Sequence, residues 1–427
     1  MDVFSKVTAL AKRRGFIFPG SEIYGGLANT YDYGPLGAEL LRNLRNLWWD
    51  FFVTKRENIY GLETSVIMNP KVWEASGHTA SFSDTLKECK SCHQRSRVDQ
   101  LTDDKCPNCS ASDWTEPKKF NLLFATKVGI VPESQAQVYL RGETAQGMFV
   151  DFKQVLDTVS PKLPFGLAQS GKCFRNEITQ GQQVFRTLEF DLAEFEWYIK
   201  EKEWQKWFEY WQAEMMKFAG LLGVDKQKLK WRAHSQDELS HYSKRTEDLE
   251  YQFPFGYKEW FGCAYRTDFD LKNHMEKSGV DLRYTDPETG EKFIPHVIEP
   301  TFGLSRTLLV LLIDAYHEDK DRVVLKLQPK LAPYKAAVFP LLANKPELIK
   351  LARSVYTDLA KTMAVRWDDN GNIGKRYRRQ DEAGTPWCIT VDFASLKDKD
   401  VTVRDRDTMK QTRIRIDKLA AYFKEQL

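Results

Sequence analysis

The sequence predicts an α+β fold, with a large antiparallel-sheet domain followed by a smaller domain built on a mixed sheet. Three observations support this. Between residues 121 and 200, apolar and polar side chains alternate with period 2 between short turns, as they do in strands. A polar segment with four cysteines, residues 80–120, interrupts this first domain. Beyond about residue 328, strand-like and helix-like runs alternate, which favours an α/β arrangement.

The first domain, expected over residues 1–328, shows the following elements in chain order. A helix is expected at 36–55, where apolar residues recur at helical spacing after a Gly-Pro, and a strand at 59–70 before a proline. Strands are expected at 120–126, 137–149, 165–177 and 184–199, then an amphipathic helix at 202–223. Residues 247–271 return to strands, and residues 296–316 read as strand, turn and helix.

The second domain, expected over residues 329–427, alternates strands and helices. The expected elements are a strand at 334–342, a helix at 346–362, a strand at 363–369, a helix at 371–384, strands at 386–393 and 400–408, and a helix at 412–426. Residues 330–427 hold 20 basic and 13 acidic side chains, whereas the whole chain has a net charge of only +3. This excess predicts a polyanion bound at the C-terminal end, although a chance imbalance on a solvated surface explains the count equally well.

Length and composition limit the class of protein. The chain has 427 residues, 42% hydrophobic and 29% charged, which describes a soluble globular protein of two or three domains. It has no run of about 18 apolar residues, so we expect no membrane span. The N-terminus lacks the apolar core and cleavage site of a secretory signal, so we expect a cytoplasmic protein.

Four of the seven cysteines form two pairs, Cys89-x2-Cys92 and Cys106-x2-Cys109, with 13 residues between the pairs. Two such knuckles at this distance are typical of a tetrahedral four-thiolate zinc ribbon. Four free thiols are the main alternative. Because four thiolates close the coordination shell, we expect this Zn²⁺ to be structural.

Charged side chains stand in the middle of the predicted sheet, where they need partners or a ligand. Arg175 and Arg186 lie on the two arms of one hairpin, among several carboxylates, and Arg306 lies at the start of a helix, where anions are favoured. Salt bridges would explain any one of these arginines. The three together, without a Walker-type glycine loop, favour a nucleotide site unlike a P-loop or a Rossmann fold.

These segments resemble the class II aminoacyl-tRNA synthetases. The hairpin "CFRNEITQGQQVFRTLEF" resembles motif 2, "GLSRTLLVLLIDAY" resembles motif 3, and the helix and strand before Pro70 resemble motif 1, which forms a dimer interface in that family. Further segments resemble the dimeric glycyl-tRNA synthetases: "RRGFIFPGSEIYGGLANTYDYGPLGAEL", "VWEASGHTASFSD", "RGETAQGMFVDF", "KLPFGLAQSGKCFRNEIT", "HYSKRTEDLEYQFPFG", "RTDFDL", "HVIEPTFGLSR", "GNIGKRYRRQDEAGTP" and "TVRDRDTM". The resemblance covers nearly the whole chain and implies a class II catalytic domain and a C-terminal anticodon-binding domain.

The resemblance also implies the reaction and its participants. Glycine would attack the α-phosphate of ATP, with Mg²⁺, to give glycyl-adenylate, and tRNA(Gly) would then accept the glycyl group on a homodimeric enzyme. The implied catalytic residues are Arg175 (α-phosphate), Glu177 and Arg306 (γ-phosphate). The implied ATP-binding residues, among which Phe185 stacks on adenine, are Arg175, Asn176, Glu177, Phe185, Arg186, Thr187, Leu188, Glu189, Phe190, Glu259, Trp260, Gly303, Leu304, Ser305 and Arg306. The implied glycine or adenylate residues are Arg97, Glu143, Phe190, Glu194, Arg266, Glu299, Thr301 and Gly303.

The sequence departs from the family pattern at several positions in these motifs. The departures are Gly142 for proline, Thr179-Gln180-Gly181 for a run with an arginine, Leu188 for arginine, Leu192 for glutamine, Phe261 for an acid, Thr301 for serine and Ser305 for aspartate. They leave open an alternative, a divergent synthetase paralog that activates another small amino acid or binds RNA without charging it.

Overall fold

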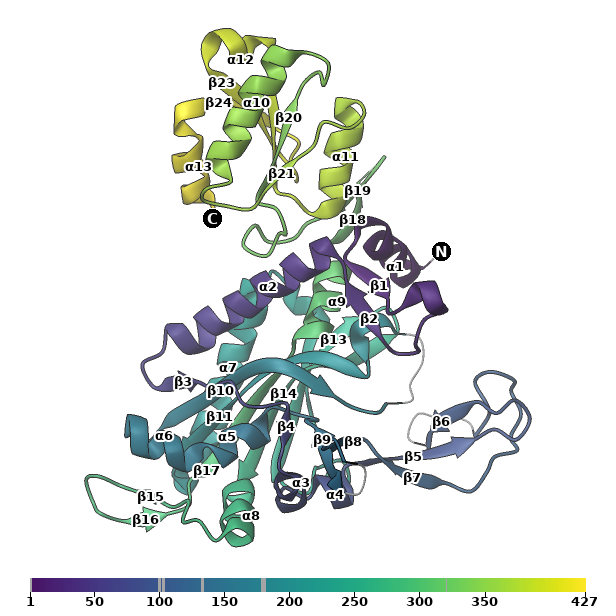
Figure 1. The fold of residues 1–427 in the computed structure, drawn as a ribbon, viewed down its shortest axis with the longest axis vertical. Helices are drawn as coiled ribbons and strands as arrows, with labels where there is room; N and C mark the ends of the chain where they lie inside the picture. Colours follow the sequence, from purple (N-terminus) through teal and green to yellow (C-terminus); the bar gives the residue numbers. More distant parts are fainter. Residues whose placement is uncertain (1, 99–100, 102–103, 132–133, 178–181, 320) are drawn as a thin grey trace.

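The protein has two parts stacked along its long axis, a larger N-terminal part and a smaller C-terminal one (Figure 1). The computed structural model describes residues 2–98, 101, 104–131, 134–177, 182–319 and 321–427. Both parts combine helices with sheets, so the predicted α+β class is confirmed. None of the helices within the described ranges is long and apolar enough to cross a membrane.

A seven-stranded sheet forms the centre of the N-terminal part. In spatial order its strands are β12 (Leu229–Ala233), β13 (Arg245–Phe253), β14 (Gly256–Thr267), β17 (His296–Gly303), β11 (Glu189–Ile199), β10 (Phe165–Phe174) and β3 (Ile59–Gly61). All neighbours are antiparallel except β10 and β3, which run parallel. In the strand register, Glu194 of β11 lies opposite Gln169 of β10 and Thr301 of β17, so these three residues are neighbours across the sheet.

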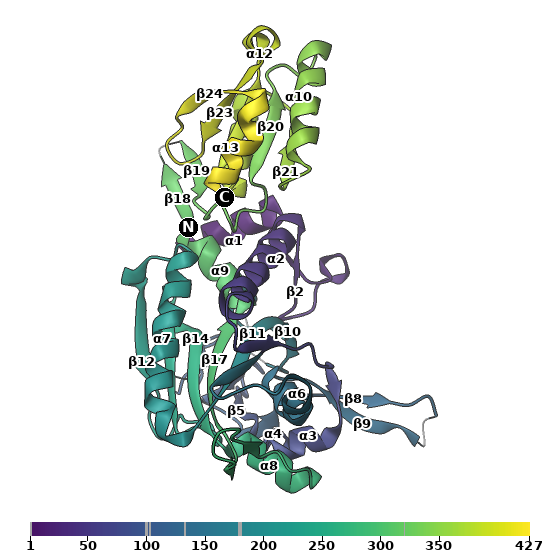
Figure 2. The same cartoon turned by 90° about the vertical axis from the view of Figure 1, so that its left-hand side faces the viewer.

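One face of this sheet is apolar and is covered by helices (Figure 2). They are α2 (Pro35–Trp49) with its wider final turn η2 (Asp50–Thr54), α7 (Trp204–Leu221) and α9 (Leu304–Asp314), and α1 (Val3–Arg14) packs against α9. Alternate residues of β11, Phe195 among them, point to this face; the Phe52 ring lies 5.6 Å from Phe195 and 4.7 Å from Phe302. Period-2 alternation therefore leaves Glu194 and Glu196 on the opposite face.

Short helices close one end of that opposite face: α3 (Pro70–Ala75), α4 (His78–Ser81), α5 (Ala145–Val150), α6 (Phe152–Val159) and α8 (Phe269–Ser278). The expectation of a strand over 137–149 holds only for β9 (Ala136–Leu140) and is wrong for residues 145–149, which belong to α5. The physical reason is burial: Ala145 to Phe149 are all buried, because α5 is enclosed on every side, so they show no alternation. The expected strand run 247–271 likewise ends at Thr267, and α8 follows.

The four-cysteine segment extends away from the main sheet (Figure 1). It contains the sheet β6-β5-β7, made of β5 (Ser83–Glu88), β6 (Arg95–Arg97) and β7 (Lys118–Asn121). A second small sheet joins β4 (Ile67–Met68), β9 and β8 (Phe124–Val128). The remaining two-stranded pairs are β1 (Ile17–Pro19) with β2 (Tyr31–Tyr33), β15 (Tyr284–Thr285) with β16 (Lys292–Phe293), and β18 (Tyr316–Asp319) with β19 (Arg322–Leu325).

The C-terminal part has a five-stranded mixed sheet in the order β21-β20-β22-β23-β24. Its strands are β20 (Ala336–Pro340), β21 (Val365–Trp367), β22 (Trp387–Val391), β23 (Asp400–Asp405) and β24 (Gln411–Arg415); its helices are α10 (Pro346–Leu359), α11 (Ile373–Ala383), α12 (Phe393–Asp398) and α13 (Leu419–Gln426). The expected helix over 412–426 is wrong in its first part. Residues 411–415 pair with β23 as an edge strand, and α13 begins only at Leu419.

The two parts are joined by ion pairs and hydrogen bonds to α11 and its neighbours. Arg322 on β19 bonds to Asp381 on α11 at 3.0 Å, and Arg404 on β23 bonds to the same carboxylate at 2.8 Å. Arg406 donates to the carbonyls of Leu327 and Gly384, both at 2.9 Å. Because these groups are largely buried, the C-terminal part is attached through specific polar contacts as well as through the connecting chain.

Candidate functional site

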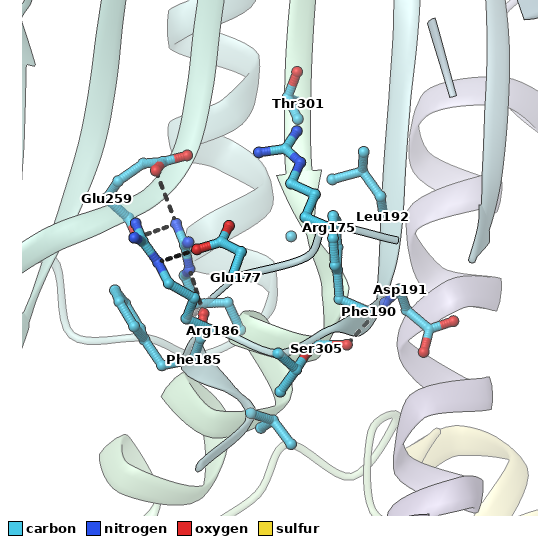
Figure 3. A pocket seen from close by; sticks show the side chains of 14 residues that line it. Arg175, Glu177, Phe185, Arg186, Phe190, Asp191, Leu192, Glu259, Thr301 and Ser305 are labelled. Carbon is cyan, nitrogen blue, oxygen red and sulfur yellow. Dashed lines mark hydrogen bonds and ion pairs between the residues drawn. The ribbon is translucent and has the colours of Figure 1, made fainter. Parts of the chain in front are cut away.

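A cleft opens on the polar face of the main sheet, between the hairpin β10–β11, strand β14 and the start of α9 (Figure 3). Its lining residues are Arg175, Glu177, Val184, Phe185, Arg186, Thr187, Phe190, Asp191, Leu192, Glu259, Thr301, Gly303, Ser305 and Arg306. Three arginines and two carboxylates, Glu177 and Glu259, supply most of the charge in this cleft.

Arg175 stands just beyond the end of β10 and points toward the sheet floor near Thr301 (Figure 3). Its Nε donates to the carbonyl of Gly142 at 3.0 Å, and the rings of Phe82 and Phe190 lie 5.1 and 5.4 Å from its guanidinium carbon. Among the described residues its Nη atoms form no hydrogen bond. The guanidinium group is thus held in place by one hydrogen bond from Nε and by two aromatic rings, while its Nη atoms remain available to bind an anion.

Arg186 pairs with Glu177 across the same hairpin, with 3.1 Å between Nε and Oε2. Its Nη1 is buried and has no hydrogen-bond partner among the described residues. Burial lowers the pKa of Arg186, and the nearby charges of Arg97 and Arg306 act in the same direction. Buried, unpaired donors beside two other cations indicate that this end of the cleft is built for a polyanion.

Arg306 lies in the first turn of α9, where its Nη1 is 3.1 Å from Glu259 Oε2 and donates to the Glu259 carbonyl at 2.6 Å. The charge of Arg306 lowers the pKa of Glu259, so this carboxyl stays ionised at neutral pH. The guanidinium carbon of Arg306 also lies 4.5 Å from the centroid of Phe185. Phe185, Arg306 and Glu259 therefore form one corner of the cleft, with an aromatic face, a cation and a carboxylate.

Five residues of the predicted nucleotide set do not line this cleft. Trp260 and Leu304 are buried in the apolar core, and Glu189 points outward to Lys172, with 2.8 Å between the charged atoms. Asn176 is exposed, and Leu188 is half-buried with its amide bonded to Asn29. Glu189 on β11 and Trp260 on β14 neighbour the site residues Phe190 and Glu259, so strand alternation turns their side chains to the other face, and Leu304 packs with the apolar side of α9.

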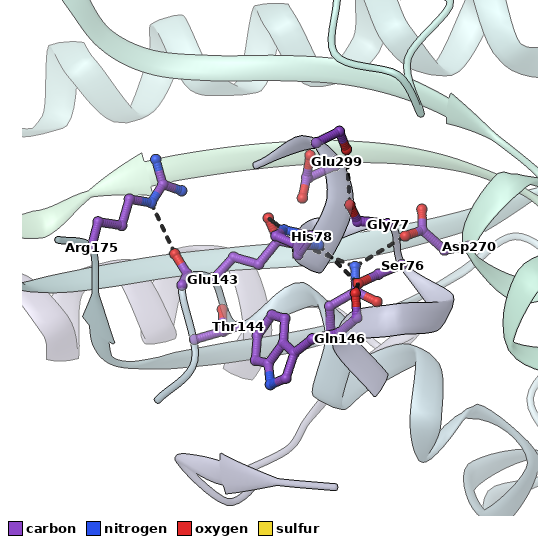
Figure 4. A network of polar contacts seen from close by, with 12 residues as sticks. Ser76, Gly77, His78, Glu143, Thr144, Gln146, Arg175, Asp270 and Glu299 are labelled. Atoms are coloured by element: carbon purple, nitrogen blue, oxygen red, sulfur yellow. Dashed lines mark hydrogen bonds and ion pairs between the residues drawn. The ribbon is translucent and has the colours of Figure 1, made fainter. Parts of the chain in front are cut away.

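A cluster of buried acidic side chains, here named the anionic pocket, adjoins the cleft at Thr301 on the same face of the sheet (Figure 4). Its carboxylates, all buried, are Glu143, Glu194, Glu196, Asp270 and Glu299. Arg266 is the central cation: it bonds to Asp270 through two nitrogens, each at 2.8 Å, and to Glu299 at 2.9 Å. Five carboxyl groups surround one arginine, and burial raises the pKa of three of them, Glu194, Glu196 and Glu299, so a small cation such as an ammonium group would stabilise their ionised forms.

Two of these carboxylates, Glu194 and Glu299, lie on neighbouring strands, and Glu194 lies next to the cleft. Glu194 Oε1 accepts hydrogen bonds from the amide and the hydroxyl of Thr144, both at 2.6 Å, and its Oε2 lies 3.5 Å from the Thr301 hydroxyl. Burial raises the pKa of Glu299 to about 8, against the opposing charge of Arg266. Burial also raises the pKa of Glu194. A cation bound beside Glu194 and Glu299 would therefore stabilise the ionised form of each carboxyl group.

The structure thus assembles Glu143, Glu194, Arg266, Glu299 and Thr301 from the predicted substrate set, with Phe190 and Gly303 in the adjoining cleft. Arg97, the remaining member, lies instead on β6, where it pairs with Asp84 at 3.0 Å and influences Arg186 electrostatically. The prediction missed Ser76, His78, Thr144, Gln146 and Asp270. These five residues belong to segments that already resembled the family, "SGHTASFSD", "RGETAQGMF" and "RTDFDL". From the sequence alone, however, polar residues in such segments cannot be distinguished from surface residues.

Of the six departures within the described residues, Leu192, Thr301 and Ser305 line the cleft, whereas Gly142, Leu188 and Phe261 do not. Phe261 packs in the apolar core, with its ring 4.7 Å from Phe302, so it takes no charge out of the anionic pocket. Ser305 accepts hydrogen bonds from the Tyr33 hydroxyl at 2.7 Å and the Asp191 amide at 2.9 Å. Thr301 is on the pocket floor, whereas Thr179-Gln180-Gly181 falls outside the described residues.

The four predicted zinc ligands come together in the insert. The Sγ atoms of Cys89, Cys92, Cys106 and Cys109 all lie within 4.8 Å of one another. The shortest pairs are Cys89 with Cys109 at 3.6 Å and Cys92 with Cys106 at 3.5 Å. Four converging thiol groups fit a tetrahedral metal ion, and Zn²⁺ is the ion that such a donor set favours.

Comparisons with known proteins agree with this arrangement. Residues 128–315 match the family model of the tRNA synthetase class II core domain (G, H, P, S and T), and residues 335–426 match that of the anticodon binding domain. The glycine–tRNA ligase of Caldanaerobacter subterraneus subsp. tengcongensis is 49% identical, over 99% of this chain and 98% of the relative. Those of Geobacillus thermodenitrificans and Alkaliphilus oremlandii are each 48% identical, over 99% of this chain and 97% and 98% of the relatives. The chain therefore belongs to the glycine–tRNA ligase family of class II aminoacyl-tRNA synthetases.

Proposed function

We propose that this protein is a glycine–tRNA ligase that activates glycine with ATP and transfers the glycyl group to the 3′ end of tRNA(Gly). The observation that supports this most strongly is the pairing of two sites on one sheet face. A cleft with Arg175, Arg186 and Arg306 suits a triphosphate, and the adjoining pocket with Glu194 and Glu299 suits the ammonium group of an amino acid.

In the activation step, a carboxylate oxygen of glycine attacks the α-phosphorus, and the bond from that phosphorus to pyrophosphate breaks. No side chain needs to act as a nucleophile, so the protein contributes position and charge. Arg175 points its free fork toward the floor where the two sites meet, which suits the α-phosphate and the charge that develops on it. Arg186 and Arg306 are placed for the leaving pyrophosphate.

Mg²⁺ would neutralise part of the triphosphate charge in this reaction. The residues present fit the ion, because Mg²⁺ prefers a few carboxylate ligands together with phosphate oxygens. Glu259 remains ionised beside Arg306, and Glu177 lines the same cleft beside Arg186. These two carboxylates are the residues that would hold it.

Selection of glycine follows from the crowding of the anionic pocket. Glu194 and Thr301 face each other at 3.5 Å across the floor, and Arg266 fills the space behind them. One added methylene costs only about 1–3 kcal/mol in a loose pocket, but a clash in a filled pocket costs more. The extra methyl group of Thr301, compared with serine, acts in this direction.

Further proposals rest on family membership. The catalytic domain spans residues 1–328, with the insert 80–120, and the anticodon-binding domain spans residues 329–427, whose basic excess suits RNA. The insert holds a structural Zn²⁺, the active form is a homodimer, and the enzyme works in the cytoplasm. Metal analysis and light scattering of the purified protein test the first two of these.

The decisive experiment is ATP–pyrophosphate exchange with single amino acids, followed by charging of tRNA(Gly). We expect exchange with glycine, and at most traces with alanine or serine. Exchange with another small amino acid would identify a divergent paralog. Binding of tRNA without any exchange would identify a protein that recognises RNA but does not charge it.

A further inference from the structure

His78 lies on α4 beneath the anionic pocket, and it is only 1% exposed (Figure 4). Its Nε2 is 3.2 Å from Glu143 Oε2, and its Nδ1 is 2.8 Å from the Ser76 hydroxyl. The rings of Trp73 and Phe82 pack on it, with centroids 5.3 and 4.9 Å away. The imidazole therefore cannot turn away from Glu143 without opening a packed interior.

The hydrogen-bond donors and acceptors fix where the ring protons lie. An ionised Glu143 can only accept, so Nε2 of His78 carries a hydrogen that it donates to Glu143. The Ser76 hydroxyl can donate to Nδ1 of a neutral ring. It can also accept from Nδ1 of a cationic ring while it donates to the Trp73 carbonyl, 3.3 Å away. Ser76 thus satisfies both charge states of His78, and the hydrogen on Nε2 faces Glu143 in each.

Glu143 is held from its other side as well. Its Oε1 accepts from Gln146 Nε2 at 2.9 Å and lies 3.6 Å from Arg266 Nη2. His274 Nε2 is 2.8 Å from Gln146 Oε1, which fixes which way that amide points. Burial raises the pKa of Glu143, but the charges of His78 and Arg266 outweigh it and lower the pKa below its usual value.

We propose that His78 is a positioning residue, which holds the Glu143 carboxylate toward the ammonium group of the bound amino acid. His78 and Gln146 each engage one oxygen of Glu143, and a lone pair of Oε2 remains for the substrate. The ammonium group then meets an acceptor that needs no rearrangement on binding. This inference rests on the proposed function, because it takes an amino acid as the ligand of the pocket.

The test compares His78→Leu, which removes the donor, with His78→Gln, which keeps an N–H donor but no charge. In glycine-dependent exchange we expect His78→Leu to raise the KM for glycine roughly 10–100-fold, the factor for losing a hydrogen bond to a charged group. The KM for ATP should stay within about twofold, because the ATP cleft makes no contact with His78. His78→Gln should recover the glycine KM to within about fivefold.

His317→Gln is the matched control, since His317 is exposed and bonds to the Ala315 carbonyl at 3.0 Å, away from both sites. An unchanged glycine KM in folded His78→Leu would overturn the proposal. So would an equal rise in both KM values, or no recovery in His78→Gln, since either result points to general disruption. If His78→Leu does not fold, Ser76→Ala provides the test. We expect this variant to raise the KM for glycine severalfold, and an unchanged KM would contradict the proposal.

The shift in melting temperature caused by glycine gives the same comparison without turnover. We expect glycine to raise the melting temperature of the wild type and of His78→Gln more than that of His78→Leu. A wild type without exchange refutes the proposed function. An equal shift in all three proteins refutes the positioning role, so the two failures are distinguishable.

Discussion

Replacing Arg175 by lysine tests whether the guanidinium fork, and not merely a positive charge, stabilises the reaction at the α-phosphate. Lysine keeps the charge but loses the Nε contact to the Gly142 carbonyl and the flat surface between Phe82 and Phe190. Hydrogen bonds to charged groups are worth about 1.5–3 kcal/mol each. Loss of one such bond in the transition state, about 2 kcal/mol, lowers kcat/KM for exchange roughly 30-fold.

Arg175→Gln removes the charge too, so a loss of about 3–4 kcal/mol, or roughly 200–1,000-fold, is expected. The assay is glycine-dependent ATP–pyrophosphate exchange, with kcat and KM measured separately. Because Arg175 acts on the developing charge, most of the loss should fall on kcat. The matched control is Arg283→Lys, an exposed arginine paired with Asp281 at 2.9 Å. Full activity in Arg175→Lys, or equal losses in both variants, would refute the reasoning.

Three further predictions concern metal, pH and stability. Cys106→Ser should lower zinc below about one ion per chain and loosen the insert, seen by metal analysis and by proteolysis within residues 80–120, because one of four thiolates is lost. Glu299 ionises above a pKa of about 8, so the KM for glycine should fall as pH rises from about 7 to 8.5, and Glu299→Gln should flatten this profile. Asp191 is wholly buried and pairs with Arg45 and Lys172, which are each more than a third exposed. Asp191→Asn should therefore lower the free energy of unfolding by about 1–3 kcal/mol, measured by urea unfolding. An unchanged urea midpoint would show that these ion pairs contribute nothing to stability.

The main sheet could be predicted from the sequence because one of its faces is apolar and the other is polar. Strands β10, β11, β13, β14 and β17 are each eight or more residues long, and polar and apolar residues alternate over parts of β11 and β13. The prediction from the sequence was wrong at α5 and β24, for opposite reasons. The α5 residues are buried on all sides and show no period, whereas β24 is an exposed edge strand joined to a helix by a single turn, so its residues appeared to continue that helix.

Much of the cleft could be predicted because most of its lining residues belong to the hairpin β10–β11 and the start of α9, with Glu259 on β14 and Thr301 on β17. The anionic pocket was harder, because it draws Ser76 and His78, Gln146, and Asp270 from three segments that are distant in sequence. Each of these residues is polar and lies in the first turn or at the end of a helix, where polar side chains are usually solvated. Only tertiary contacts distinguish Asp270, which is 2% exposed, from a surface acid.

The division of charge across the sheet face explains how one amino acid is presented to one phosphate. The cleft side carries Arg175, Arg186 and Arg306, and the pocket side carries the buried carboxylates around Arg266. Arg175 lies at the boundary, since its Nε bonds to the carbonyl of Gly142, the residue before Glu143. An amino acid is itself a dipole, so its ammonium group is drawn to the carboxylates and its own carboxylate to Arg175. In the proposed reaction, the same field that binds the substrate would orient the reacting oxygen toward the phosphate, so the protein would need no nucleophile of its own.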